Sequence, residues 1–173
     1  MSGTTDNLDF NNLANDIRNP TYEYYPPKTD GVWPRDLQIL KWAYPFVLYP
    51  LAAQLPSGGL FLFVSNASVI INTDTDEIST KVPDLIVPEH MPWIYPYSPT
   101  MVMLPLTKKN GYKATLMVCG GSYKEPVKGD IVSSGTCRKI SPDDEDPKWV
   151  AEEDMPIGRV MIDSAILPGK LSF

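Results

Sequence analysis

The chain has 173 residues, of which 43% are hydrophobic and 21% are charged, a balance typical of a folded globular domain rather than a disordered chain. Its 18 prolines, about twice the usual share, and its 11 glycines interrupt the sequence too often for an all-helical fold. The formal charge is −6, and no Lys/Arg cluster is present that would neutralise a run of phosphates, so nucleic acid is not an expected partner.

Residues 1–17 are rich in Asn and Asp and are weakly patterned, so we expect a flexible lead-in there and one domain over residues 18–173. The first thirty residues contain no apolar run of the kind that a signal peptide needs. No later stretch approaches the roughly 18 apolar residues of a membrane span. The sequence therefore predicts no membrane partner, and it leaves the compartment of this chain unknown.

The first regular elements are expected to be short. Aromatic side chains within 21–25 precede the stop Pro26-Pro27, which predicts a brief strand. The stretch 33–42 has apolar residues at mixed spacing behind Asp36. It predicts one or two helical turns in a long connection.

A repeated pattern of four short strands begins at Tyr49. The predicted strands of the first unit lie within 49–55, 60–64, 68–73 and 78–82, separated by Pro/Gly, Asn and acidic turn signals. The same pattern recurs within 100–106, 115–121, 136–140 and 149–152, and a third copy opens with a strand at 159–167. Successive Leu-Pro pairs, which end at Pro56, Pro105 and Pro168, are 49 and 63 residues apart.

A period near 50 with a glycine pair after the second strand is typical of kelch repeats. We therefore predict an all-β fold, an incomplete kelch-type β-propeller with about two four-stranded blades and parts of the flanking ones. The runs 60–64 and 116–118 are apolar at successive positions, as strands covered on both faces require. Gly120 and Gly121 are expected to permit close approach of neighbouring groups. A β-sandwich with similar turns is the alternative.

Two features concern covalent chemistry. Cys119 and Cys137 are the only cysteines. They would form a disulfide in an oxidising compartment, contributing about 3 kcal/mol by loop closure, or stay as two buried thiols in a reducing one. Asn66-Ala67-Ser68 is an N-glycosylation sequon, a pattern that also arises by chance. Both features suit a secreted protein.

We assign no catalytic, cofactor-binding or metal-binding residue. His90 is the only histidine, and one imidazole beside Glu89 supplies too few ligands for copper. The acidic residues 143–146 and 152–154 lack the spacing of a calcium loop, so a solvated hairpin tip is favoured over a cation site. Serine hydrolysis lacks a partner base and a Gly-x-Ser-x-Gly elbow. The aromatic cluster 93–97 fits packing better than a carbohydrate platform.

Six segments together resemble the glyoxal oxidases, fungal and plant relatives of galactose oxidase, and the similarity runs from about residue 18 to the end of the chain. These segments are Asn19–Lys28 (NPTYEYYPPK), Leu55–Phe61 (LPSGGLF), Leu104–Leu106 (LPL), Leu116–Ser122 (LMVCGGS), Cys137–Ile140 (CRKI) and Arg159–Asp163 (RVMID). The resemblance implies a seven-bladed kelch propeller, normally extracellular, that carries one copper ion and a cysteine-cross-linked tyrosine radical. Such enzymes oxidise aldehydes or primary alcohols and reduce O₂ to H₂O₂.

In that family the cross-linked cysteine and its tyrosine precede the Asn-Pro-Thr-Tyr-Glu segment, and a second tyrosine and two histidine ligands follow the repeat that opens near Arg159. For Cys119 to be the cross-linked cysteine it would need a tyrosine, and Tyr112 and Tyr123 lie in loop-like sequence. The resemblance therefore implies a fragment without the copper site, inactive alone, whose aldehyde or alcohol substrate binds only the full-length enzyme. The alternative is a non-enzymatic kelch-like interaction module that acts through loops such as Ser122–Gly135.

Overall fold

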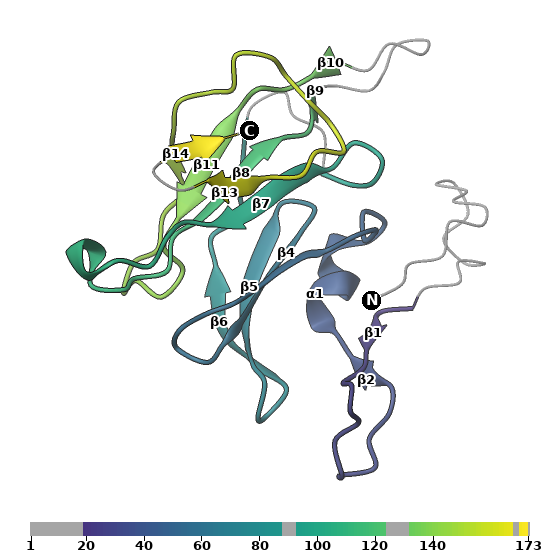
Figure 1. The fold of residues 1–173 in the computed structure, drawn as a ribbon. Coiled ribbons are helices and arrows are strands. Elements are labelled where there is room, and N and C mark those ends of the chain that lie inside the picture. Colours follow the sequence, from purple (N-terminus) through teal and green to yellow (C-terminus); the bar gives the residue numbers. More distant parts are fainter. Residues whose placement is uncertain (1–18, 88–92, 124–131, 168–169, 173) are drawn as a thin grey trace.

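Two four-stranded antiparallel sheets form the centre of the molecule (Figure 1). The computed structural model describes residues 19–87, 93–123, 132–167 and 170–172. The first sheet is the meander β3 (Leu51–Gln54), β4 (Leu60–Val64), β5 (Ala67–Asn72) and β6 (Glu77–Val82). The second sheet contains β7 (Pro99–Met103), β8 (Leu116–Gly120), β11 (Cys137–Ile140) and β12 (Val150–Ala151), in this spatial order. Both predicted meanders are confirmed.

Smaller elements flank the two sheets. The predicted strand near Thr21 is confirmed as β1 (Thr21–Tyr22), which pairs with β2 (Arg35–Asp36), and the predicted helical turns form α1 (Gln38–Ala43). A 3₁₀ turn, η2 (Lys108–Asn110), lies in the connection between β7 and β8. Two further hairpins consist of β9 (Ser122–Tyr123) with β10 (Val132–Ser133), and β13 (Ala165–Leu167) with β14 (Lys170–Ser172).

Side chains alternate between the two faces of each strand, and in the central strands β4, β5 and β8 both faces are buried. In β4, Phe61 and Phe63 point toward the second sheet, whereas Leu62 and Val64 pack against α1. The second sheet alternates in the same way. Leu116 and Val118 face the first sheet, while Met117 and Cys119 line the far face together with Cys137 and Met155.

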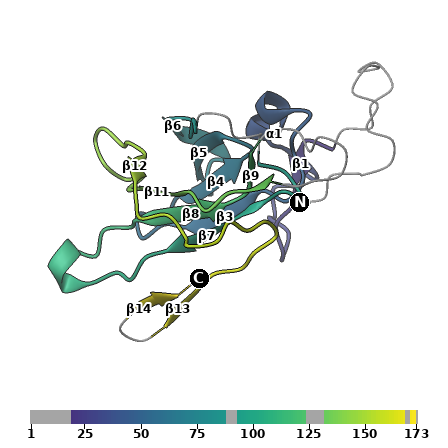
Figure 2. The same ribbon diagram turned by 90° about the horizontal axis from the view of Figure 1, so that it is seen from above.

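The elements therefore stack in layers. Figure 2 shows α1, the first sheet and the second sheet in succession, with the β13–β14 hairpin standing apart beyond the second sheet. A sandwich would leave the outer face of each sheet solvated. Here the outer face of the first sheet packs on Leu37, Ile39 and Leu40, and that of the second packs on Met155 and Ile162. This stacking on both faces is the arrangement expected of neighbouring propeller blades.

The glycine pair after β8 allows the close approach that the sequence predicts. Gly120 and Gly121 have φ values of +86° and +92°, which residues with a side chain adopt rarely. A Cβ atom on Gly120 would lie 2.7 Å from the carbonyl oxygen of Arg159, and one on Gly121 would lie 2.1 Å from Nε1 of Trp93. The two glycines therefore let the end of β8 lie directly against Arg159 and Trp93, which are distant in sequence.

The prediction that a strand begins at Arg159 is wrong. Strand β13 starts only at Ala165, and residues 159–164 form an irregular segment across the second sheet. The backbone of Arg159 is bound on both sides, because its N–H donates to Ser134 O and its carbonyl accepts from Gly121 N, each at 3.0 Å. Met161 has a φ of +52°, which bends the chain out of an extended conformation. The N–H and carbonyl groups of Arg159 are therefore not available to pair with a neighbouring β-strand.

Candidate functional site

A dense group of interacting polar side chains surrounds Asp76. We call Tyr22, Tyr24, Lys28, Arg35 and Asp76 the Asp76 cluster. Asp76 Oδ1 accepts hydrogen bonds from Tyr22 OH at 2.9 Å, Tyr24 OH at 2.7 Å and Lys28 Nζ at 2.9 Å. Asp76 Oδ2 accepts from Arg35 NH1 at 2.5 Å. One carboxylate thus binds four donors from the N-terminal hairpin.

The turn between β5 and β6 places this carboxylate. Asn72 Oδ1 accepts from the N–H of Asp74 at 2.9 Å and of Thr75 at 3.3 Å, and Asn72 O accepts from Asp76 N at 2.8 Å. Asp76 adopts a φ of +64°, a conformation that Asp and Asn tolerate better than most residues. The turn therefore fixes the Asp76 side chain against the N-terminal hairpin.

Cations and rings complete the cluster. Lys28 Nζ lies 4.4 Å from the centre of the Tyr24 ring, and the Arg35 guanidinium lies 5.6 Å from it. Tyr22 and Tyr24 make an edge-to-face contact, with ring centres 5.5 Å apart. Arg35 NH2 also donates to both carboxylate oxygens of Asp30. Arg35 is 8% exposed, so this buried cation is balanced by two carboxylates.

The hydrogen bonds set the protonation of the cluster. Burial by itself would raise the pKa of Asp76, but hydrogen bonds from Tyr24, Lys28 and Tyr22 outweigh it and lower that pKa to about 2. Burial, and then hydrogen bonding to the neighbouring groups, raises the pKa of Tyr22. The pKa of Tyr24 is also raised, chiefly by burial and by the bond to Asp76. Both phenols therefore stay protonated at neutral pH.

This arrangement suits attachment of the hairpin better than catalysis. A general base needs a free lone pair and a pKa near the working pH, whereas Asp76 is saturated with donors and remains ionised. Both phenol hydroxyl groups are already engaged, because each donates to Asp76 Oδ1. The Asp76 cluster therefore ties the β1–β2 hairpin to the first sheet.

We expect Asp76→Asn to lower the free energy of unfolding by about 2 kcal/mol, the scale of hydrogen bonds to a charged group. Asn keeps the shape and tolerates the positive φ, but it loses the charge and replaces one acceptor oxygen with an amide group that cannot accept a hydrogen bond. Because the pKa of Asp76 is depressed in the folded state, its contribution is full above the ordinary pKa near 3.8 and disappears as the pH falls through about 2.

Thermal unfolding of wild type and of Asp76→Asn between pH 2 and pH 6 measures the difference in stability between them. The gap between wild type and Asp76→Asn should close toward pH 2. Asp74→Asn is the matched control, because it removes the same charge from an exposed side chain of the same turn and should change little. A gap that stays constant down to pH 2 would show that the charge of Asp76 does not hold the hairpin.

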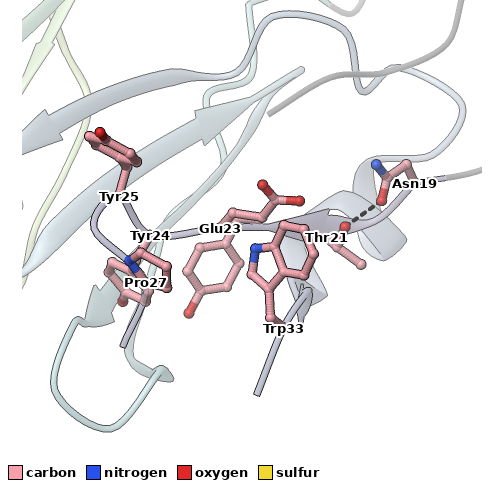
Figure 3. Close-up of a pocket in the computed structure, with 8 residues that line it drawn as sticks. Asn19, Thr21, Glu23, Tyr24, Tyr25, Pro27 and Trp33 are labelled. Carbon is pink, nitrogen blue, oxygen red and sulfur yellow. Dashed lines mark hydrogen bonds between the residues drawn. The ribbon is translucent and has the colours of Figure 1, made fainter. Parts of the chain in front are cut away.

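A pocket of about 370 Å³ lies beside this hairpin and is lined largely by aromatic residues (Figure 3). Its walls include Tyr22, Tyr24, Tyr25 and Trp33, with the carboxylate of Glu23 nearby and a hydrogen-bonded Asn19–Thr21 pair at one end. Tyr25 is fully exposed and Trp33 is 64% exposed. The pocket presents aromatic surface and one carboxylate, without a nucleophile paired to a base.

Sequence reasoning missed the Asp76 cluster. The only signal was the spacing of Tyr22 and Tyr24, which places both rings on one side of an extended segment. Nothing in the sequence linked them to Asp76, which reads as part of an acidic hairpin tip.

The two cysteines lie directly opposite each other on β8 and β11, and a disulfide joins Cys119 to Cys137. Both are buried. Their sulfur atoms are bonded to each other, so neither is available for a thioether link to a tyrosine. Tyr112 is exposed in the connection before β8, and the side chain of Tyr123 lies outside the described residues.

The acidic residues pair with neighbouring cations instead of gathering at one point. Ion pairs join Lys113 to Asp144, Lys148 to Asp146 and Lys139 to Glu152. Asp143 accepts from Ser57 Oγ at 2.9 Å, which links the ends of the two sheets. Within residues 19–87, 93–123, 132–167 and 170–172, no group of three or more His, Cys, Asp or Glu side chains is placed to hold a metal ion.

The aromatic cluster 93–97 divides in two. Trp93 and Ile94 are buried, and Trp93 packs against Phe63 with ring centres 5.5 Å apart. Tyr95 is instead 37% exposed, and its ring makes a tilted contact with the ring of Tyr49. The packing interpretation therefore holds for the first two residues and fails for Tyr95.

Of the remaining residues singled out in the sequence, the structure describes some and not others. Asn66 is exposed in the tight turn between β4 and β5. His90 and residues 124–131 of the Ser122–Gly135 loop lie outside the described residues, as does the lead-in 1–17. In the described part of the chain no helix is both long and apolar enough to cross a bilayer.

Comparison with known proteins supplies the family. Residues 15–171 match the family described as glyoxal oxidase N-terminus. An aldehyde oxidase GLOX from Vitis pseudoreticulata is 33% identical over 160 residues, which cover 84% of this chain and 28% of that protein. Aldehyde oxidase GLOX1 from Arabidopsis thaliana is 30% identical over 131 residues, covering 70% of this chain and 21% of that protein.

A WSC domain-containing protein from Arthroderma benhamiae is 32% identical over 132 residues, covering 75% of this chain and 14% of that protein. The chain thus spans less than a third of the length of each of these relatives. The match nevertheless extends from just before the β1–β2 hairpin to the last described strand, across both stacked sheets and the disulfide. The chain therefore belongs to the glyoxal oxidase N-terminus family.

Proposed function

We propose that this chain forms part of the kelch-type propeller scaffold of a glyoxal oxidase-like enzyme, and that it carries no copper centre of its own. The complete enzyme would oxidise aldehydes or primary alcohols with O₂ and release H₂O₂. The names of the grapevine and Arabidopsis relatives support aldehydes as the substrate class. The stacked four-stranded sheets support the scaffold role, because each blade covers the face of the next.

The proposal that this chain carries no copper centre rests on the metal ligands that its sequence and structure offer. A copper–radical centre of the kind that the family resemblance implies needs more than one imidazole and a cysteine that can bond to a tyrosine. This chain has one histidine, and its two cysteines are bonded to each other. The hydroxyl groups of Tyr22 and Tyr24 are both engaged in hydrogen bonds to Asp76. The residues present do not fit such a centre.

We also propose that the protein is made in an oxidising, extracytoplasmic compartment. The buried disulfide between Cys119 and Cys137 supports this location, since cytosolic thiols are kept reduced. Asn66 is exposed in a turn, where a glycan would project into solvent.

The test of the proposed function has two arms. The purified 173-residue chain, loaded with copper and given glyoxal or methylglyoxal, should produce no H₂O₂ above the level of free copper in a peroxidase-coupled assay. Copper-dependent turnover by the chain alone would overturn the proposal.

The second arm replaces the matching region of the Vitis pseudoreticulata aldehyde oxidase with residues 15–171 of this chain. The chimera should keep copper-dependent H₂O₂ production with an aldehyde. The matched control carries Gly121→Ala within the grafted segment, and it should lose that activity together with its folding. A well-folded chimera without activity would show that this scaffold does not serve an aldehyde oxidase.

A further inference from the structure

Two tyrosine rings form an exposed, tilted pair near the start of the first strand of each sheet. Tyr49 lies just before β3, and Tyr95 lies shortly before β7. Their ring centres are 4.8 Å apart with an angle of 40° between the planes. One ring thus comes from the segment that leads into each sheet, and we call this feature the Tyr49–Tyr95 pair.

The pair is open to solvent. Tyr49 is 67% exposed and Tyr95 is 37% exposed. Large aromatic side chains are normally buried for most of their surface because burial stabilises the fold. These two rings cover each other in part, and most of the Tyr49 surface is left free. The pair therefore contributes little to the core.

The backbone at Tyr49 is held in an unfavourable conformation. Its φ is +56°, in the left-handed region where a Cβ atom crowds the backbone. Glycine would adopt this conformation more easily. Strained residues that face solvent are often held for a purpose other than stability. A tyrosine at this position supplies a ring that glycine cannot.

The two sequence segments that carry the pair are uncharged. Residues 42–73, which contain Tyr49, have no Asp, Glu, Lys or Arg, and neither do residues 91–107, which contain Tyr95. This is unusual in a chain with 36 charged residues. A charged ligand would find no partner in these segments, whereas a neutral one would lose little by leaving water.

We propose that the Tyr49–Tyr95 pair is a binding platform for neutral carbohydrate. The apolar C–H face of a pyranose ring packs on an aromatic face, and its hydroxyl groups remain free to bond to water or to a tyrosine hydroxyl. A small aldehyde would instead need an enclosed pocket that removes most of its surface from water. The open position of the pair therefore favours a sugar chain lying across it. This inference does not depend on the proposed oxidase activity.

The test is saturation-transfer NMR on the 173-residue chain, with cellohexaose in large excess as the neutral probe. Wild type should transfer magnetisation to the C–H protons of the sugar rings. Tyr49→Ala and Tyr95→Ala should weaken binding by about tenfold or more, while Tyr49→Trp should retain it because a larger ring preserves the stacking surface.

Two further variants separate binding from folding. Tyr49→Gly relaxes the positive φ, so it should keep or raise the melting temperature while abolishing binding. Tyr112→Ala is the matched control, because Tyr112 has a φ of +57° and is 60% exposed but lies in a loop with Lys108, Lys109 and Lys113. It should bind cellohexaose as wild type does.

Several results would overturn the proposal. It fails if wild type shows no transfer to cellohexaose, or if Tyr112→Ala weakens binding as much as Tyr49→Ala. It also fails if benzaldehyde, an uncharged aromatic aldehyde, competes fully for the pair, since the platform would then serve a small substrate. Loss of aldehyde oxidation in the chimera described above, with sugar binding retained, would refute only the proposed enzymatic function.

Discussion

Gly121→Ala is expected to destabilise the chain by about 3 kcal/mol, the combined scale of a forced left-handed backbone and an overpacked core. The φ of Gly121 is +92°, and an added Cβ would lie 2.1 Å from the indole nitrogen of Trp93. Trp93 is buried against Phe63 and cannot move aside without disturbing the core between the sheets. Urea or thermal unfolding, monitored by circular dichroism, measures the loss.

Gly58→Ala is the matched control for this prediction. Gly58 has the same φ of +92°, but no atom lies within 4 Å of the position that its Cβ would take. We expect a cost of about 1 kcal/mol there, from the backbone conformation alone. Equal losses at the two positions would contradict the close contact between Gly121 and Trp93.

Loss of the disulfide should have an effect of similar size. Cys119 and Cys137 are 18 positions apart, and a cross-link over that distance restricts the unfolded chain by about 3 kcal/mol. For a chain of this length, that corresponds to a fall of roughly 6–12 °C in melting temperature. We expect this fall in the variant Cys119→Ala/Cys137→Ala, measured by differential scanning calorimetry.

Reduction of the wild type separates the bond from the packing of the two side chains. Reduced wild-type protein should melt near the double variant, and a reductant should leave the variant unchanged. Mass spectrometry after alkylation in denaturant supplies the direct check. Two alkylated cysteines in unreduced protein would show that the bond is absent.

Local patterns in the sequence predict much of this fold. The apolar runs 60–64 and 116–118 identify strands that are covered on both faces, and the turn residues Gly58, Asn66 and Gly120 mark where the meanders reverse. These features depend on residues that are close in sequence. The same local information gives the short helix after Asp36 and the lengths of most strands to within a few residues.

Contacts between distant segments are what the sequence could not supply. Arg159–Asp163 reads as a strand from its apolar residues, but hydrogen bonds to Gly121 and Ser134 hold Arg159 in an irregular path. Asp76 binds side chains that are 41 to 54 positions away. The Tyr49–Tyr95 pair joins two loops in the same way. Each of these sites exists only because the two sheets and the first hairpin are packed together.

The two sheets adhere through side chains, and this has a consequence for temperature. Their strand ladders are separate, and the contact between them consists mainly of Phe61, Phe63, Leu116 and Val118. The hydrophobic attraction between apolar side chains weakens on cooling. The hydrogen bonds within each sheet do not rely on that attraction. Near freezing, the apolar contact between the two sheets should therefore weaken before the hydrogen bonds within either sheet break. Cooling rather than heating would then separate the two sheets while each is still folded.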